Sequence, residues 1–267
     1  MRYLLVCLCL LPFLVKAQED TTVRKKSQWS LLVGTGASYQ FARDRGMSSL
    51  RYKGVQTASQ AELLWIRPKS EHRLVGRFDY GTLESERNGA EVTAYRGGGY
   101  YRFLHKGPSF WKNRLHLSYG GTLDGFWNLR YHTGYSNNAY NNEFYLSLAP
   151  AAQIAFPFRL FKQQFTLSYT AHLPLATYVV RQGFSGTYFD AFINEEVDGV
   201  KGALQSGYMS GWGTFRRYYS EFGLEYTLKN GNGMRVVYTW DYYRLNSRYN
   251  PVEAGLKGGL FSIIYQF

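Results

Sequence analysis

Residues 261–267 read Phe-Ser-Ile-Ile-Tyr-Gln-Phe, and aromatic or aliphatic side chains occupy every second position of this stretch. Alternation with a period of two predicts a β-strand with one apolar face and one different face. A strand of this kind, with no polar tail after Phe267, fits poorly in water. It suits a strand that closes a barrel whose outer surface meets lipid. The stretch therefore predicts a membrane-embedded β-barrel.

The same residues resemble the terminal strand of the outer-membrane β-barrel proteins of Gram-negative bacteria. In that family a final Phe follows apolar residues two and four positions earlier, as Phe267 follows Tyr265 and Ile263 here. The resemblance covers most of the mature chain and implies an architecture rather than an activity. It also implies the barrel-assembly machinery as a partner during biogenesis, because that machinery reads this pattern in the family.

The first residues have the pattern of a secretory signal peptide. Arg2 supplies a positive charge, residues 4–15 are apolar, and the small Ala17 precedes a polar segment. This pattern predicts a signal peptide over 1–17, a periplasmic lead-in over 18–28 and a barrel over 29–267 in the cell outer membrane. A permanent helical anchor is the alternative, but the apolar run is too short to span a membrane. Cys7 and Cys9 both fall in the removed segment, so no disulfide or thiolate site is expected.

From Trp29 onward, alternating segments follow one another, separated by polar or Gly-rich breaks. The segments are 29–42, 50–66, 72–83, 90–104, 113–130, 142–157, 164–181, 214–228, 234–246 and 256–267. The breaks alternate between short connections and wider loops. The short connections are tight turns at 68–71, 159–162 and 229–233 and a slightly longer one that contains 107–108, and the wider loops are 43–49, 84–89, 131–141, 182–213 and 247–255. About ten strands, short periplasmic turns and long extracellular loops predict an all-β, antiparallel, up-and-down transmembrane barrel. A soluble β-sandwich is the alternative, because its periodicity is similar.

Each strand can be assigned an outer and an inner face. In segment 113–130, Leu117 and Leu123 share one face, whereas Thr122 and Asp124 share the other. An Arg or Lys on the lipid face at the membrane midplane costs about 2–4 kcal/mol. The apolar faces are therefore expected to point to lipid, and the polar faces to point into the barrel.

Charged residues of both signs fall on the predicted inner faces. They are Glu62, Arg73, Arg77, Asp79, Arg96, Arg102, Asp124, Glu143, Arg217, Glu221, Glu225, Arg235 and Asp241. A barrel of this size has a narrow interior that its own side chains largely fill. Unpaired charges there would be costly, so these groups are expected to pair. A cross-linked plug is favoured, and a narrow polar path for a small solute is the alternative.

His116-Leu117-Ser118 resembles the His-x-Ser pair of outer-membrane phospholipases and lipid A deacylases, in which the His activates a Ser nucleophile. In those enzymes the pair faces lipid and Asn follows the Ser. Here the alternation turns His116 and Ser118 inward, and Tyr119 follows. His116 is instead expected to bond a carboxylate such as Asp124 or Glu143. No enzyme activity, metal or cofactor is predicted, since no phosphate-binding or zinc motif occurs.

The formal net charge is +12, and the secretory address disfavours nucleic acid as the partner. Arg43, Arg45, Arg51, Arg216, Arg244 and Arg248 fall near the predicted outer loops. They are candidates for binding the phosphates of outer-membrane lipid and lipopolysaccharide, with ordinary loop solubility as the alternative. The Tyr- and Asn-rich residues 135–142 suggest a surface glycan or protein partner, or simply a polar loop.

These observations predict a non-enzymatic scaffold, or a narrow transport or binding protein, with a charged and largely plugged lumen. A lipid-acting hydrolase of the His-x-Ser type is one alternative, and an accessory subunit of an export or uptake complex is another.

Overall fold

The computed structural model describes residues 27–267 except 113, 133, 135–138, 182–206 and 247–250. The expected signal peptide and nearly all of the lead-in lie outside the described residues. The strands are β1 (Gln28–Asp44), β2 (Arg51–Ile66), β3 (Ser70–Ser85), β4 (Glu91–Phe110), β5 (Leu115–His132), β6 (Tyr140–Leu160), β7 (Gln163–His172), β8 (Ala176–Arg181), β9 (Tyr208–Gly211), β10 (Phe215–Thr227), β11 (Gly233–Leu245) and β12 (Val252–Gln266).

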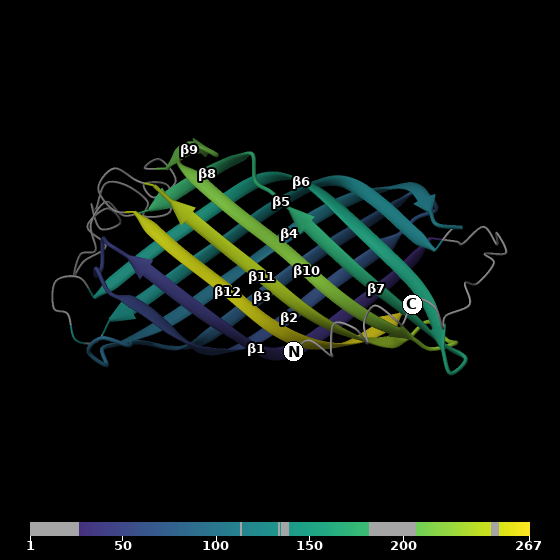
Figure 1. Ribbon diagram of the computed structural model, residues 1–267, viewed down its shortest axis with the longest axis horizontal. Coiled ribbons are helices and arrows are strands. Elements are labelled where there is room, and N and C mark those ends of the chain that lie inside the picture. Colours follow the sequence, from purple (N-terminus) through teal and green to yellow (C-terminus); the bar gives the residue numbers. More distant parts are fainter. Residues whose placement is uncertain (1–26, 113, 133, 135–138, 182–206, 247–250) are drawn as a thin grey trace.

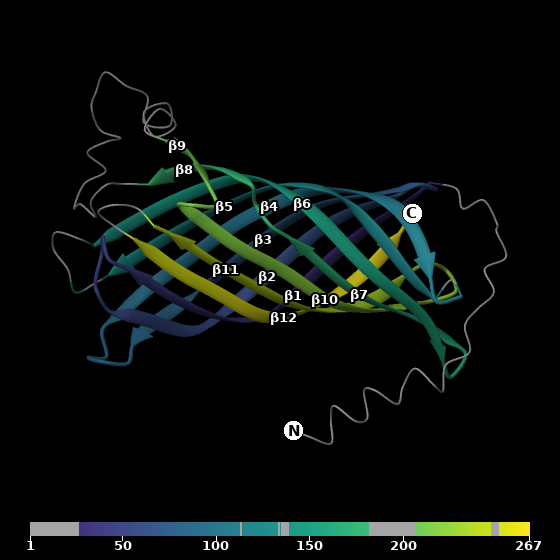
Figure 2. The ribbon, with the colours of Figure 1, turned by 45° about the horizontal axis from the view of Figure 1, so that its top comes forward.

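These strands form one antiparallel sheet that closes on itself (Figure 1). Consecutive strands pair from β1 to β6 and from β10 to β12, and β1 also pairs with β12. One half of β6 pairs with β7 and the other half with β8, so β7 and β8 occupy a single place in the wall. Likewise, β10 pairs with β7 and short β9 pairs with β8, so β9 and β10 together occupy the next place in the wall. The described chain therefore confirms a closed ten-stranded barrel, and Figure 2 shows its strands inclined to the cylinder axis.

The break between β7 and β8 has a local cause in Pro174, which lacks the amide donor that a strand pairing needs. The amides on either side keep their partners: Leu173 donates to the carbonyl of Pro150 at 3.3 Å, and Leu175 to that of Leu148 at 2.9 Å. The carbonyl of Pro174 accepts from the indole of Trp212. The wall is interrupted here, but both flanking amides and the carbonyl of Pro174 keep hydrogen-bond partners.

The connections alternate in length around the barrel. One end, here named the turn end, carries the connections 67–69, 111–114, 161–162 and 228–232. The other, the loop end, carries 45–50, 86–90, 133–139, 182–207 and 246–251. In bacterial barrels the short turns are periplasmic and the long loops are extracellular. The alternation expected from the sequence is therefore present in the structure.

One expected turn is misplaced. Residues 107–108 were expected to connect two strands, but β4 runs on to Phe110 and the turn is 111–114. The register with β5 shifts between Lys106 and Ser109, so Gly107 and Pro108 form an irregularity within the strand. A bulge of this kind accommodates a proline because it already lacks regular pairing.

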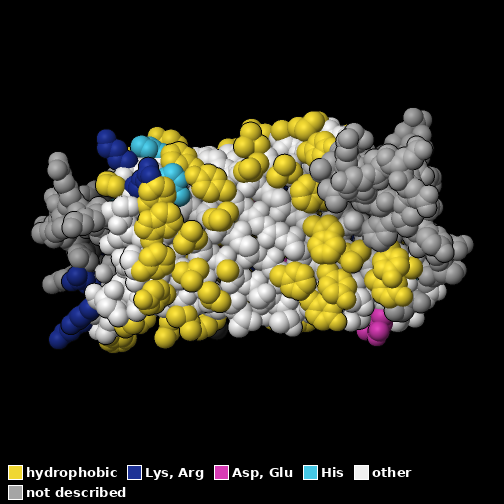
Figure 3. Space-filling view, turned by 180° about the vertical axis from the view of Figure 1, so that it is seen from behind, with side chains coloured by type: hydrophobic (Ala, Val, Ile, Leu, Met, Phe, Trp, Pro, Cys, Tyr) yellow, Lys and Arg dark blue, Asp and Glu magenta, His cyan; other side chains and the backbone are white. Residues whose placement is uncertain are grey.

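The outer surface is apolar, as the alternation predicted. Leu123, Val236 and Ile263 are 50%, 51% and 61% exposed, whereas their inward neighbours Asp124 and Arg235 are buried. Figure 3 shows apolar side chains in two bands, one toward each end of the visible face, with a paler zone between them. Exposed aromatic side chains lie toward both ends, with Trp29 and Tyr265 toward the turn end and Tyr218 and Trp240 toward the loop end, as in the aromatic girdles of membrane barrels. The soluble alternative, with Val236 in a dry centre, is excluded.

The lumen differs from the expected polar interior in its loop-end half. An inner aromatic cluster, consisting of Tyr52, Phe126, Tyr145, Phe215 and Tyr243, is buried there among aliphatic side chains. The ring of Tyr145 stacks on Phe126 at 4.7 Å and on Phe215 at 5.0 Å between centroids. These residues occupy inward positions, so the alternation is intact. Inside a narrow barrel, neighbouring rings exclude water and pack as in a soluble core.

Candidate functional site

The candidate charged residues of the lumen all lie on the inner surface of the barrel. Eleven are buried: Glu62, Arg73, Asp79, Arg96, Arg102, Asp124, Glu143, Arg217, Glu221, Arg235 and Asp241. Arg77 and Glu225 share that face but remain partly exposed. The inner face results from strand periodicity, which turns every second side chain toward the axis. What the sequence left open was how these charges would meet, and the structure arranges them in three layers.

The layer nearest the turn end centres on Glu62. Its carboxylate accepts from Arg73 Nη1 at 2.8 Å and from Arg235 Nη1 at 2.8 and 2.9 Å. Beside it, Glu221 accepts from the hydroxyls of Tyr219 at 2.6 Å and Tyr100 at 3.0 Å. Arg102 completes this layer 3.5 Å from Glu221, below the ring of Tyr100. Strands from opposite sides of the wall are thereby joined across the lumen.

The middle layer centres on Arg217, which bridges two aspartates. Its Nε and Nη2 donate to the two carboxylate oxygens of Asp241 at 2.9 Å each, and its Nη1 donates to Asp124 at 2.5 Å. Arg96 also pairs with Asp241. The guanidinium of Arg217 lies 4.2 Å above the ring of Phe126, which connects this layer to the inner aromatic cluster. Charge-assisted, bidentate bonds of this kind hold side chains in one geometry.

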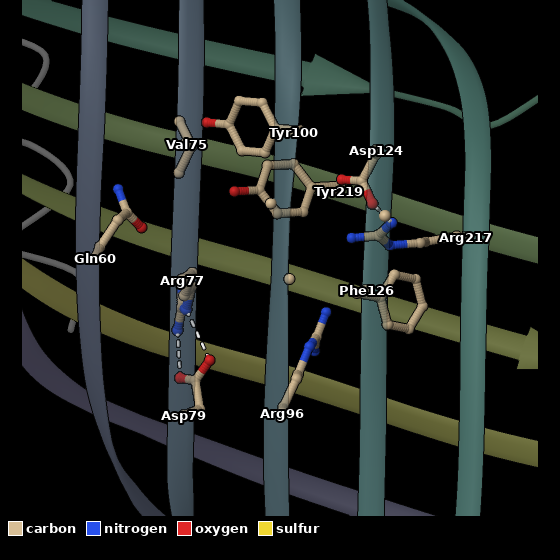
Figure 4. Close-up of a pocket in the computed structure, with 13 residues that line it drawn as sticks. Gln60, Val75, Arg77, Asp79, Arg96, Tyr100, Asp124, Phe126, Arg217 and Tyr219 are labelled. Carbon is tan, nitrogen blue, oxygen red and sulfur yellow. Dashed lines mark hydrogen bonds and ion pairs between the residues drawn. The ribbon is translucent and has the colours of Figure 1, made fainter. Parts of the chain in front are cut away.

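A small cavity remains beside the middle layer (Figure 4). Gln60, Arg77, Arg96, Tyr100 and Tyr219 line it, together with backbone of glycines on β4 and β5. In Figure 4, Arg77 is held to Asp79 by two hydrogen bonds, both 2.9 Å long. Apolar side chains and groups of both charges line the cavity, because Val75, Phe126, Asp79 and Asp124 border it together with the arginines, and it has room for water.

Of the third layer, nearest the loop end, only Glu143 was expected from the sequence. Arg130 approaches Asp44 at 3.4 Å, pairs with Glu143, and donates to the hydroxyl of Tyr243 at 2.9 Å. Arg181 pairs with the other oxygen of Asp44. Extending the alternation past the expected strand end would have found Asp44, because it lies two residues after the inward Ala42.

The candidate catalytic pair lies at the turn end, on the inner face and partly exposed. His116 Nδ1 is hydrogen-bonded to Ser109 Oγ at 2.8 Å, and no bond joins His116 to Ser118 in the described part of the chain. The expected bond from His116 to Asp124 or Glu143 is therefore wrong. Asp124 is eight residues farther along the same strand, which places it about 27 Å away. The histidine beside Asp124 is His172, 3.5 Å away.

Four of the candidate lipid-phosphate residues lie in one row around the loop end. In the strand pairing, Arg216 is opposite Arg244, Arg244 is opposite Glu253, Glu253 is opposite Arg43, and Arg43 is opposite Arg51. We name these five residues the loop-end row. Arg45 follows the end of β1 and is exposed, and Arg248 lies outside the described residues.

The described residues, 27–267 with the gaps given above, contain neither a metal-binding cluster nor a helical membrane span. Within these ranges, no group of three or more His, Cys, Asp or Glu side chains is arranged to hold a metal ion. The same part of the chain contains no helix long and apolar enough to cross a membrane.

A closed antiparallel barrel with an apolar outer wall and charged side chains within is the architecture of an outer-membrane β-barrel protein. The chain belongs to the family described as "Protein of unknown function (DUF3316)", whose model matches residues 3–254. No curated protein matches the sequence.

Several solved barrels are similar to this chain in fold. The outer membrane protease OmpT from Escherichia coli has 9% identity and a TM-score of 0.42, and the match covers 90% of this chain and 96% of OmpT. The translocator domain of the autotransporter NalP from Neisseria meningitidis has 7% identity and a TM-score of 0.34, and the match covers 88% of each chain. The toluene transporter TodX from P. putida has 7% identity and a TM-score of 0.24, and the match covers 92% of this chain and 91% of TodX. The assignment of the barrel rests on the strand pairing of this chain itself.

Proposed function

We propose that this protein is a non-enzymatic outer-membrane barrel whose closed lumen makes it a scaffold or binding protein rather than an open channel. The observation that carries this proposal is the sequence of buried layers across the lumen. Two ion-pair layers, the inner aromatic cluster and a third ion-pair layer follow one another from the turn end to the loop end. Any binding function would then reside on the outer surface and at the loop end.

The energetics of the layers support a closed state. Removing one partner of a buried ion pair typically costs about 3–5 kcal/mol, because the remaining charge stays buried without compensation. A solute passing the middle layer would have to separate Arg217 from Asp241 or Asp124, and would then meet the ring of Phe126. A ten-stranded barrel has little interior space beyond that of its own side chains.

The outer-membrane location is part of this proposal. A secretory signal over 1–17 would direct the chain across the inner membrane, and the apolar outer wall would then require lipid. Ile263 and Tyr265 point outward on β12, 61% and 58% exposed, and Phe267 follows at 66%. These side chains would be available to the barrel-assembly machinery before the strand joins β1.

Single-channel recording in planar lipid bilayers tests the closed lumen. The full mature chain, refolded in detergent and inserted, is expected to give no discrete current steps. A variant with Phe126→Ser, Tyr145→Ser and Tyr243→Ser serves as the control, because it removes three of the five rings of the inner aromatic cluster, together with the contacts of Arg217 to Phe126 and of Arg130 to Tyr243, and should leak ions. Heat-modifiable migration in gel electrophoresis would verify that both proteins are folded. Reproducible steps from the unmodified protein would refute the proposal.

Narrow transport is the second candidate, because the small cavity beside Arg77 and Arg96 interrupts the packing of the lumen. It predicts small but reproducible conductance that changes its ion selectivity in Arg96→Gln. The closed scaffold predicts no current in either protein, so the same recording separates the two candidates.

A further inference from the structure

The loop-end row is a continuous line of charge on the outer wall of five adjacent strands. Strand pairing, and not a shared sequence motif, brings together its members at positions 43, 51, 216, 244 and 253. Neighbouring strands are about 4.8 Å apart, so the row is about 19 Å long. All four arginines are exposed, and their side chains leave the barrel on the same side as its apolar residues. The row therefore borders the region that lipid occupies.

Aromatic side chains lie directly beneath the row, toward the middle of the membrane. Tyr218 of β10 is opposite Tyr242 of β11, and each lies two residues from the arginine of the row on its strand. Phe41 of β1 likewise lies two residues from Arg43. The guanidinium of Arg51 lies 4.5 Å from the centroid of the Phe41 ring. Aromatic girdles mark the membrane interface, where polar headgroups begin. The arginines are thus at the level of lipid phosphates rather than out in solvent.

A lysine extends the positive surface below the row. Lys257 points outward from β12, and its ammonium lies 5.4 Å from the ring of Tyr39. A lysine within an apolar wall extends its stem along the surface and turns its charge toward the headgroups. Glu253 lies between the arginines and is 3.8 Å from Arg51, so one acidic group partly offsets four guanidinium groups.

The four arginines of the row lie together on β10, β11, β1 and β2, on one side of the barrel. On the next strands, Glu84 of β3 is opposite Glu91 of β4. Beyond them, Tyr131 and Tyr140 stack at 4.6 Å on β5 and β6. Loop solubility alone would not require the arginines to align on one arc and at one depth. Alignment on one arc suits a ligand that is itself extended and negatively charged.

We propose that the loop-end row is a binding site for lipopolysaccharide, and that its arginines bind the phosphates of that glycolipid. Two features point to lipopolysaccharide. The long connections assign the row to the outer leaflet. The length of the row suits a headgroup with more than one phosphate, whereas a phospholipid with a single phosphate would engage one or two of the arginines. Arginine is suited to this task because its planar fork forms paired hydrogen bonds with phosphate oxygens.

Binding of fluorescently labelled lipopolysaccharide to the refolded full chain in zwitterionic detergent tests this site. The row variant carries Arg43→Gln, Arg51→Gln, Arg216→Gln and Arg244→Gln. Each basic side chain near a lipid surface contributes enough to weaken binding about five-fold on removal. The control variant, Lys69→Gln, Lys112→Gln, Lys162→Gln and Lys229→Gln, removes the same charge from exposed turn-end positions.

Weaker binding by the row variant, with unchanged binding by the control, is the expected result. Higher salt should weaken binding of the unmodified protein in the same direction, because exposed charges are screened. Equal affinities for the row and control variants would overturn the proposal. Equal affinity of the unmodified protein for phosphatidylglycerol would overturn the assignment to lipopolysaccharide. Should the row variant fail to fold, Arg43→Gln with Arg244→Gln provides a milder test with the same two outcomes.

Discussion

Arg235 on β11 donates from one nitrogen to both carboxylate oxygens of Glu62 on β2, although 173 residues separate the two in the chain. Two strands, β12 and β1, lie between them in the wall. Glu62 also accepts from Arg73, so one carboxylate compensates two buried guanidinium groups. The charged lumen therefore connects parts of the wall that do not pair with each other.

Substitution of Glu62 by alanine should destabilise the barrel strongly. Glu62→Ala leaves Arg235 buried with Glu221 at 4.0 Å as its remaining carboxylate, whereas Arg73 keeps Glu71 at 3.1 Å. Breaking a buried pair in this way costs about 3–5 kcal/mol. Urea unfolding in lipid vesicles, followed by tryptophan fluorescence, measures the loss. Glu253→Ala is the control: Glu253 and Arg51 are 34% and 57% exposed and 3.8 Å apart. An exposed pair contributes about 0–1 kcal/mol. Equal losses for the two variants would contradict the importance of the lumen pairs.

An arginine on the outer wall should be tolerated near the loop end and harmful in the middle. Phe78 and Thr82 share the outer face of β3, four residues apart, and Thr82 is nearer the loop end. Phe78→Arg is expected to cost about 2–4 kcal/mol, as for midplane positions, and Thr82→Arg about 0–1 kcal/mol. Folding yield and urea midpoints in vesicles report the difference. A smaller loss for Phe78→Arg than for Thr82→Arg would rule out the inferred position of the membrane.

The turn between β6 and β7 offers a stabilising change. Phe161 and Lys162 have φ values of 49° and 64°, a left-handed conformation that costs residues other than Gly about 1–2 kcal/mol. Lys162→Gly should therefore raise the free energy of unfolding, by up to about 1 kcal/mol after the greater flexibility of Gly in the unfolded chain is counted. Lys69→Gly, in a turn without positive φ, should not stabilise. Both variants remove one exposed charge, so a gain in both would point to charge rather than backbone.

The candidate pair His116 and Ser118 should be dispensable for any lipid hydrolysis. His116 is hydrogen-bonded to Ser109 at 2.8 Å, and both members of the pair lie on the inner face, away from lipid substrate. Ser118→Ala and His116→Ala are expected to leave phospholipid and lipid A hydrolysis unchanged, measured by release of fatty acid from labelled vesicles. Activity in the unmodified protein that disappears in Ser118→Ala would restore the hydrolase alternative.

Much of the fold could be predicted because strand periodicity is a local property. Residues 234–242 alternate between apolar and polar or small side chains, and this alone distinguishes lipid-facing Val236 from lumenal Arg235. The misplaced turn at 107–108 shows the limit of that approach. Gly and Pro usually end a strand, but here the pairing with β5 continues past them to Phe110. The partner strand, and not the local sequence, decided where β4 ends.

Taken alone, the amino-acid sequence determined a membrane barrel of about ten strands and the direction in which Leu123 or Asp124 points. It could do so because the period of two and the opposed polarity of lipid and lumen act on each strand separately. Only the tertiary structure decided that Glu62 meets Arg235, that Phe126 joins an aromatic cluster, and that Arg43 and Arg244 share one row. Those relationships depend on the register between strands and on closure of the sheet, which bring together residues that are distant in the chain.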